Sequence, residues 1–474
     1  MRWGPRPRLW ASQWPWRWLP SRRGRWWSWP SHWSKRPRGR PSPTSPPRGK
    51  RSPGTLGALG TPGTPMKRGY TRPMSERVEH QRAPSPSRPS YWPLFAATFL
   101  VGVVMISLGP LLDPILADLD IPLSQAGLLS VAFATGMLVG VFALNFLLAR
   151  VPASLTIVVA AWVQAAGLAA SGLLARGLWT LFVTYFFVGL GIVFLNSLPG
   201  MWVGSHVKVG THRAMVVLLL FFAVGMMVAP LVIGAVLGLG AGWRWVFGGE
   251  AVLSAVVAVL LTVRPMSDIS GRENLRLRQL RAVIGFNRAL FAAVLAASVL
   301  YIGSEFILNV WLPKFAIDTF GVGKSVASVA VTLFWVGLVV GRLVVLGLTK
   351  RVAAWRLLAV GMGVMAVFAL AVALSVSLEM VMAMAFVSGL GASAAFPLIL
   401  GFSGRFPTWH AGVVYSAVIM AGALGRIVFP YLIGPIAEAA GFRLAMGLAF
   451  VLAGACSLLA FLLPRVSGEG EAAG

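Results

Sequence analysis

Three polar side chains, Tyr301, Glu305 and Asn309, recur every four residues inside an otherwise apolar stretch. Residues four apart lie on one face of an α-helix, so the spacing predicts a polar stripe along a helix over 289–313. An ionisable group inside a membrane-spanning helix is costly, which makes it a candidate for function. Because burial favours the uncharged form of a carboxyl group, Glu305 is the first candidate for binding a transported proton. The alternative is an acid that holds its helix to a neighbouring helix.

Two arginines are also expected inside apolar helices. Arg342 lies near one end of a helix over 325–348, and Arg426 lies deep inside a helix over 411–435. Either guanidinium group could bind an anionic substrate. Arg342 has two alternatives, closing a gate against a carboxylate or reaching lipid headgroups ~9 Å away at the helix end. The alternative for Arg426 is an ion pair with a carboxylate inside the membrane.

Three further polar residues complete the candidates. Asp113 precedes Pro114 near the end of a helix expected over 92–116, where it would serve as a water-exposed cap, a gate or a substrate contact. Asn196 and Gln164 could hydrogen-bond either a substrate or a neighbouring helix, and the second use is the commoner one in membranes.

Motifs for other kinds of chemistry are absent from the sequence. It contains no phosphate-binding G-x-x-x-x-G-K-[ST] loop, so the chain is not expected to use ATP or another cofactor. His206, His212 and His410 have no cysteine or carboxylate at ligand spacing, which predicts no metal site. No catalytic triad or carboxylate pair is recognisable from spacing, so we expect a protein that is not an enzyme.

The composition identifies the elements that must position these side chains. Apolar residues make up 57% of the chain and charged residues 12%, and the mean hydropathy is +0.77. Apolar runs of the length needed to cross a bilayer recur along the chain, without the period-two alternation of a membrane β-barrel. The sequence therefore predicts an all-α polytopic membrane protein. Its one cysteine, Cys456, cannot form an internal disulfide and is expected to be a small buried residue.

An internal duplication organises the apolar part. Gly136-MLV-Gly140 recurs as Gly337-LVV-Gly341, and the segment 225–234 recurs as 425–434. Each of the two segments 225–234 and 425–434 is followed by an Ala-Gly-aromatic-Arg corner. Two parallel six-helix repeats are expected, with the glycines allowing close helix packing. The expected helices are 92–116, 124–148, 153–175, 178–203, 214–238, 244–263, 289–313, 325–348, 357–376, 380–402, 411–435 and 443–463.

Five domains follow from these boundaries. Residues 1–91 hold 20 Lys and Arg beside two acids, with dense Trp, Pro and Ser, and are predicted to form a disordered basic extension. Its interpretations are a lipid- or nucleic-acid-binding arm, a targeting segment, or the product of a start codon placed too early, with Met66 or Met74 as the true start. We favour the third and expect no nucleic-acid partner.

The other domains are a bundle over 92–263, a cytoplasmic basic linker over 264–288, a second bundle over 289–463 and a tail over 464–474.

The distribution of positive charge predicts the orientation. With the amino terminus in the cytoplasm, the inner loops and the tail carry fourteen Lys and Arg after residue 91, and the outer loops carry five. Because cytoplasmic loops are enriched in positive charge, both termini are expected in the cytoplasm. The expected location is the plasma or inner membrane.

Several segments resemble one known family. They are TLFWVGLVVGRLVVLGLTKR over 332–351, LYIGSEFILNVWLP over 300–313, GPLLDPIL with SQAGLL, and LFFAVGMMVAPLVIG with GWRW. The chain from about 92 to 463 resembles the major facilitator superfamily, and most of all its fucose/galactose–proton symporter branch. That branch carries a proton-linked glutamate after the GLG of its fourth helix, where GLGIVF places Phe194 here.

The resemblance implies a function. A secondary transporter of this family works by alternating access, with its substrate in a cavity between the two halves. We expect a small solute as substrate, a co-transported proton, the lipid bilayer as surroundings and a monomeric protein. Two alternatives stay open: an exchanger or efflux carrier for organic anions or drugs, and a sensor that has kept the fold without transport.

Overall fold

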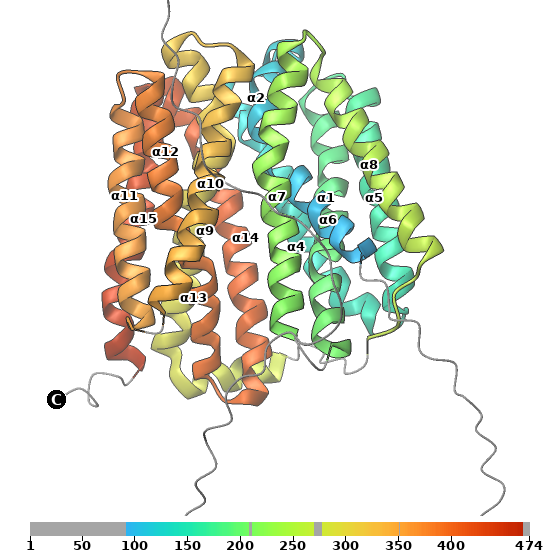
Figure 1. The fold of residues 1–474 in the computed structure, drawn as a ribbon, viewed down its shortest axis with the longest axis vertical. Helices are drawn as coiled ribbons and strands as arrows, with labels where there is room; N and C mark the ends of the chain where they lie inside the picture. The colour runs from blue at the N-terminus through green and yellow to red at the C-terminus, as the bar shows by residue number, and fades with distance from the viewer. Residues whose placement is uncertain (1–91, 208–210, 270–276, 350, 468–474) are drawn as a thin grey trace, which may run out of the picture. The chain divides into compact units, whose positions relative to one another are not determined.

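The computed structural model describes residues 92–207, 211–269, 277–349 and 351–467 (Figure 1). The extension over 1–91 and the interpretations attached to it lie outside the described residues. All regular structure in the described part is helical. The helices are α1 (Trp92–Ile106), α2 (Leu108–Asp118), α3 (Leu123–Ala126), α4 (Leu128–Leu148), α5 (Ala153–Leu174), α6 (Leu178–His206), α7 (Thr211–Gly238), α8 (Trp243–Val263), α9 (Leu277–Phe320), α10 (Lys324–Leu348), α11 (Ala354–Leu374), α12 (Leu378–Ala392), α13 (Ala395–Gly401), the 3-10 helix η1 (Phe402–Arg405), α14 (Thr408–Ala440) and α15 (Phe442–Ser467).

These helices are long and apolar enough to span a bilayer. Within the described residues, eleven spans meet both requirements, and the bent pair α1 and α2 supplies a twelfth. A helix rises 1.5 Å per residue, so spans of this length cross ~30 Å of hydrocarbon. The predicted all-α polytopic fold is confirmed.

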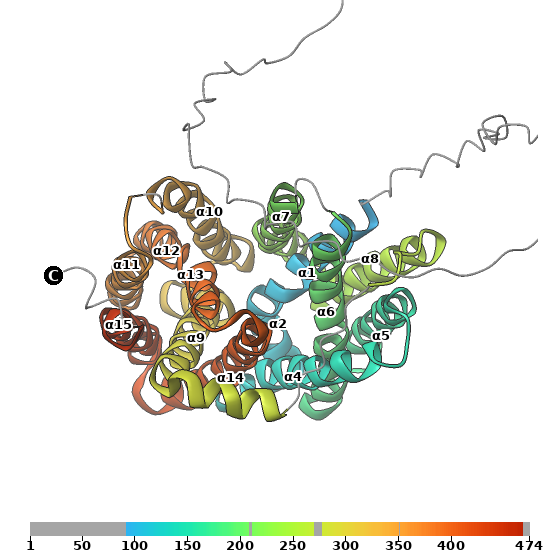
Figure 2. The same cartoon turned by 90° about the horizontal axis from the view of Figure 1, so that it is seen from below.

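The helix pairings repeat along the chain. In the first half α1 packs on α7, α4 on α6 and α5 on α8, and in the second half α9 packs on α14, α10 on α12 and α11 on α15. Seen along the helices, the two sets lie on opposite sides of the bundle (Figure 2). Each half therefore pairs its helices in the same way, as the sequence duplication predicts.

The repeated glycines allow the closest helix approaches. Gly136 lies against the backbone carbonyl of Phe186, and its counterpart Gly337 lies against the carbonyl of Phe386. A Cβ atom at either glycine would overlap that carbonyl oxygen. Small residues thus bring α4 against α6 and α10 against α12, which is how helices associate where no hydrophobic effect drives them together.

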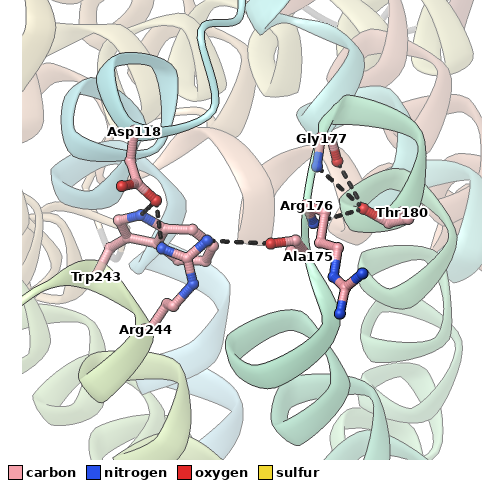
Figure 3. A network of polar contacts seen from close by, with 7 residues as sticks. All are labelled: Asp118, Ala175, Arg176, Gly177, Thr180, Trp243 and Arg244. Atoms are coloured by element: carbon pink, nitrogen blue, oxygen red, sulfur yellow. Dashed lines mark hydrogen bonds and ion pairs between the residues drawn. The ribbon is translucent and has the colours of Figure 1, made fainter.

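The repeated corner before α8 and α15 also has one structural role in both halves. Arg244 pairs with Asp118 and donates a hydrogen bond to the carbonyl oxygen of Ala175 (3.1 Å; Figure 3). Arg443 donates to the carbonyl oxygen of Ala373 (3.3 Å). Both carbonyls belong to the last turn of a helix or the residue after it, where a backbone oxygen lacks a partner within the helix. The corner arginine supplies that partner.

Three predicted segments were wrong in detail, and the residues explain why. The first helix is broken at Ser107, with a bend of 45° between α1 and α2. Pro110 causes this break, because its ring meets the carbonyl of Ile106 and it has no N–H to donate. The helix expected over 380–402 is broken between α12 and α13 in the same way, four residues before Pro397.

The third difference concerns the linker. Residues 264–288 were predicted as a loop, but helix α9 begins at Leu277 and is interrupted only at Asn287. The Asn287 side chain accepts a hydrogen bond from the Leu290 N–H (2.9 Å), so Asn287 caps the membrane-spanning part of α9. The second half of the linker is therefore a short helix that leads into the span.

One end of the two bundles joins the halves. We call it the closed end; it contains residues 118–124, 239–242, 320–324 and 440–442. The Ser124 N–H donates a hydrogen bond to Glu438 (2.6 Å), and Lys314 pairs with Asp113 (3.0 Å). Gly434 of α14 lies against the backbone of Leu123, so no side chain separates the halves there.

Candidate functional site

The polar stripe on α9 is buried, and its residues contact one another. The Glu305 side chain is 5% exposed and Asn309 is 2% exposed. The Asn309 amide donates to the Glu305 carboxyl at 3.5 Å, a long hydrogen bond, and the Tyr301 hydroxyl also interacts with this carboxyl. The spacing of four residues placed all three side chains on one helical face, as the sequence predicted.

A neighbouring helix fixes this stripe in position. The Trp335 indole N–H on α10 donates a hydrogen bond to the Asn309 oxygen (3.0 Å). The Asn309 amide therefore uses its oxygen toward α10 and its nitrogen toward Glu305. Trp335 is itself packed edge-on against Phe222 of the first half, with ring centroids 6.4 Å apart. A polar chain of hydrogen-bonded side chains, Glu305, Asn309 and Trp335, thus runs from Glu305 to the interface between the halves.

Both predicted arginines approach the same carboxyl. The charges of Arg426 and Arg342 act on Glu305, with Arg426 the stronger of the two. The Arg426 guanidinium lies over the Phe306 ring at 3.8 Å and contacts the Met137 sulfur at 2.9 Å. Among the described residues, no carboxylate lies within ion-pair distance of either arginine. Their Nε atoms are buried without a hydrogen-bond partner there.

A small cavity lies between the halves beside Arg426. In the described conformation its volume is about 10 Å³, which is room for about one water molecule. The first half contributes Met105, Leu108, Ser130, Phe133 and Tyr185, and the second half contributes Phe306, Val310 and Arg426. Ser130 Oγ and Arg426 Nε are both buried and without a hydrogen bond in the described structure. A buried donor without a partner is costly, so an acceptor atom that enters here when the halves move apart would satisfy both groups.

Asp113 belongs to the closed end and not to this cluster. Its carboxylate pairs with Lys314 at 3.0 Å and lies 3.9 Å from Lys324, and Lys314 also pairs with Asp318 at 2.6 Å. Since Asp113 is on α2 and both lysines are in the second half, these contacts connect the halves. The three roles raised by the sequence for Asp113, a cap, a gate and a substrate contact, stay predictions.

The two remaining polar candidates lie apart from the cavity. Asn196 on α6 is exposed and is not among the residues that line the cavity. Gln164 is fully buried and donates to Ser254 on α8 (3.5 Å), which is a helix-to-helix hydrogen bond. Among the described residues, no three His, Cys, Asp or Glu side chains are grouped closely enough to hold a metal ion.

Sequence reasoning missed three residues of interest. Ser130 and Trp335 carry no signal of their own, because a serine or tryptophan in an apolar helix is ordinary. Glu250 on α8 did carry one, since it is an acid inside a predicted span. It is buried, and neither of its carboxyl oxygens has a hydrogen-bond partner in the described structure.

One family model and one curated relative match most of this chain. The family model of the Major Facilitator Superfamily matches residues 94–378 and again residues 294–473. The TsgA homolog of Erwinia tasmaniensis is 23% identical over 381 residues, which cover 79% of this chain and 95% of that protein.

Solved structures share the fold at low identity. The nucleoside transporter NupG, solved as a point mutant, matches with a TM-score of 0.67 and 12% identity, covering 79% of this chain and 99% of that one. A bacterial homolog of the human lysosomal transporter Spinster, inward-facing and unoccupied, matches at 0.64 and 17%, covering 80% and 97%. A D-xylose–proton symporter matches at 0.60 and 16%, covering 79% and 96%.

Proposed function

This chain belongs to the major facilitator superfamily and is a secondary transporter of small molecules, and we propose that it couples their movement to protons through Glu305. One observation carries the proposal. Glu305 is a buried acid inside a membrane span, and the charges of two arginines act on it. Such an acid is expensive to keep in a membrane unless it has a function.

The proposed mechanism rests on the charge interaction between Glu305 and Arg426. An ionised Glu305 attracts Arg426, and protonation removes that attraction. Phe306, the next residue after Glu305, and Arg426 both line the cavity. Among the described residues the Arg426 guanidinium has no carboxylate within ion-pair distance, and a proton bound at Glu305 would keep it available to a substrate atom in the cavity. Proton and substrate binding would then favour each other, which is the thermodynamic basis of symport.

Alternating access requires two states, and the described conformation has the features of one of them. Its closed end is joined by the Lys314–Asp113 and Ser124–Glu438 contacts. With the orientation inferred from the loop charges, this end would face outward and the cavity would be reached from the cytoplasm. We therefore propose an inward-facing state, with these contacts breaking when the transporter opens outward.

The test begins with the substrate. A melting-temperature screen of the purified protein against sugars, nucleosides, carboxylates and drugs identifies ligands, because a bound ligand stabilises the folded state by mass action. The resemblance to fucose/galactose–proton symporters makes sugars one class to include. A ligand that binds but never crosses a vesicle membrane would identify a sensor in place of a transporter.

The first prediction concerns Glu305→Gln in vesicles that are energised by a pH gradient. The amide has nearly the shape of the protonated acid but cannot release a proton. We expect uphill accumulation to fall to the passive level while substrate exchange survives. Glu379→Gln, the same change at an exposed acid in the first turn of α12, is the matched control. Wild-type accumulation in Glu305→Gln would refute coupling through this residue.

A second candidate function is exchange of an organic anion. The unpartnered Arg426 Nε and Ser130 Oγ at the cavity favour it, because both can donate to a carboxylate. In that case Arg426→Gln should remove the melting-temperature shift given by carboxylates, and Arg342→Gln should reduce it less. An unchanged shift in Arg426→Gln would exclude this role.

A further inference from the structure

Glu250 is a second buried acid, and it lies in the opposite half from Glu305. It is on α8, and its side chain is 5% exposed. Neither carboxyl oxygen has a hydrogen-bond partner in the described structure. Ser107 and Tyr185 lie beside it. The Ser107 hydroxyl donates its own proton to the Val104 carbonyl oxygen (2.9 Å), so toward Glu250 it offers only its lone pairs.

The helices packed against α8 supply no counter-ion. Helices α1 and α5 and the part of α7 from Ala214 onward contain no Asp, Glu, Lys, Arg or His. Helix α2 contributes Asp113 and Asp118, which pair with Lys314 and Arg244 at the closed end. From α6, the titratable groups are Tyr185 and His206, the latter at the far end of that helix.

The neutral form of Glu250 fits these surroundings, and the ionised form does not. A carboxylate buried without a donor or a cation is strongly disfavoured, whereas a protonated carboxyl carries its own donor. Its proton can be accepted by Ser107 Oγ, whose own proton is already directed to Val104. The only arginine on α8, Arg244, is two turns away and is occupied by Asp118 and Ala175.

We propose that Glu250 is a second proton-binding site, holding a proton in the described conformation and releasing it when the first half changes conformation. Two of its neighbours lie at places that would change during transport, the cavity between the halves and the break between α1 and α2. Tyr185 also lines the cavity between the halves. Ser107 is the residue at the 45° break between α1 and α2. A change in the bend there would alter the donors available to Glu250, and with them its affinity for a proton.

Infrared spectroscopy of the full chain in liposomes tests this directly, because protonated and ionised carboxyl groups have separate absorption bands. At pH 7 the spectrum of wild type minus Glu250→Gln should contain the band of a protonated acid. The spectrum of wild type minus Glu379→Gln should contain carboxylate bands alone, since Glu379 is exposed. Carboxylate bands in the Glu250 difference spectrum would overturn the proposal.

Two further variants test whether misfolding or Glu305, and not Glu250, is the source of the infrared band. Glu250→Asp keeps the carboxyl group, so its protonated band should shift and not vanish. In a Glu305→Gln background, the Glu250 band should persist at full intensity. Loss of this band on changing Glu305 alone would assign the signal to Glu305 and overturn the proposal for Glu250, while leaving the proposed coupling role of Glu305 intact.

Stability against pH gives a second readout. An unfolded glutamate ionises above about pH 4.3, whereas a folded Glu250 that stays protonated takes up a proton on folding. Wild type should therefore lose stability relative to Glu250→Gln as pH rises from 5 toward 8, by up to about tenfold in the unfolding equilibrium constant per pH unit. A stability difference that does not change with pH would contradict a bound proton at Glu250.

Discussion

Around Glu305 there are two arginine charges for one carboxyl group, and this excess of positive charge has a consequence for transport. Two arginines act on one carboxyl group in a region from which water is largely excluded. Protonation of Glu305 leaves two positive charges without an anion, which is costly at low dielectric. A substrate carrying a carboxylate or another acceptor would relieve that cost. Proton coupling and anion recognition are therefore compatible uses of one site.

A matched pair of tryptophans tests the role of the polar chain. The Trp335 indole N–H bonds Asn309 (3.0 Å), and the Trp311 indole N–H bonds the Pro430 carbonyl oxygen (2.9 Å). Trp335→Phe and Trp311→Phe should each destabilise the protein by about 1 kcal/mol, because each leaves a buried acceptor unpaired. We expect only Trp335→Phe to lower proton-driven accumulation, by about tenfold or more. Equal loss of transport in both variants would show that the Trp335–Asn309 bond has no special role.

The residues of the site were predictable to different degrees. The stripe of Tyr301, Glu305 and Asn309 was visible from spacing, since one helix fixes their relative positions. The approach of Arg342 and Arg426 to Glu305 depends on how three helices are rotated about their axes, which spacing within one helix does not encode. From its residue type and position alone, Asn196 was as good a candidate for the site as these residues. In the structure it is exposed on α6.

Among the helices, the breaks carry more information than the regular spans. The break at Ser107 divides the first span into a part packed on α7 and α8 and a part, α2, that packs on α9 of the other half. The sequence contained the signal for this break in Pro110, and for the second break in Pro397. The helical start of α9 had no such signal, because a basic segment rich in Leu and Arg suits a loop and a helix alike.

The closed end depends on backbone contact between helices of the two halves. A Cβ atom at Gly434 would overlap the Leu123 carbonyl oxygen, so Gly434→Ala should weaken the contact of α14 with α3. We expect the population to shift toward the state in which this end is open. Spin labels at Leu174 and Leu374, exposed ends of α5 and α11, would report a longer distance in a Cys456→Ala background.

Gly447→Ala is the control for this experiment, since a Cβ atom there would meet nothing within 4 Å. It should leave the distance distribution at that of the wild type. If Gly434→Ala also leaves the distribution unchanged, the close approach of α14 to α3 does not hold this end shut.

For the whole molecule, the orientation in the membrane decides whether the closed end faces the outside or the cytoplasm. Reporters fused after Gly271 and after Arg465 should read cytoplasmic, and a reporter near Gly321 should read outside, because positive charge is concentrated in the loops assigned to the cytoplasm. Gly321 follows α9 at the closed end. A cytoplasmic signal at Gly321 would invert the proposed inward-facing state.

The duplication explains why the fold could be predicted from the sequence while the substrate could not. Matched glycines and matched corners specify the helix pairings twice, at Gly136 and Gly337 and at Arg244 and Arg443. One residue that lines the cavity departs from the repeat: Arg426 stands where the first half has Met226. A departure from the repeat has no pattern of its own, so the duplication could not predict which residues would recognise a substrate.

Proton movement during transport is the most direct test of coupling through Glu305. A ligand found by the melting screen is added to lightly buffered vesicles containing the full chain, and the external pH is recorded. Coupling predicts that the external solution becomes alkaline in proportion to substrate uptake. Glu305→Gln should abolish this change, and Glu379→Gln should preserve it. Substrate entry into wild-type vesicles without any change in external pH would contradict proton-coupled transport.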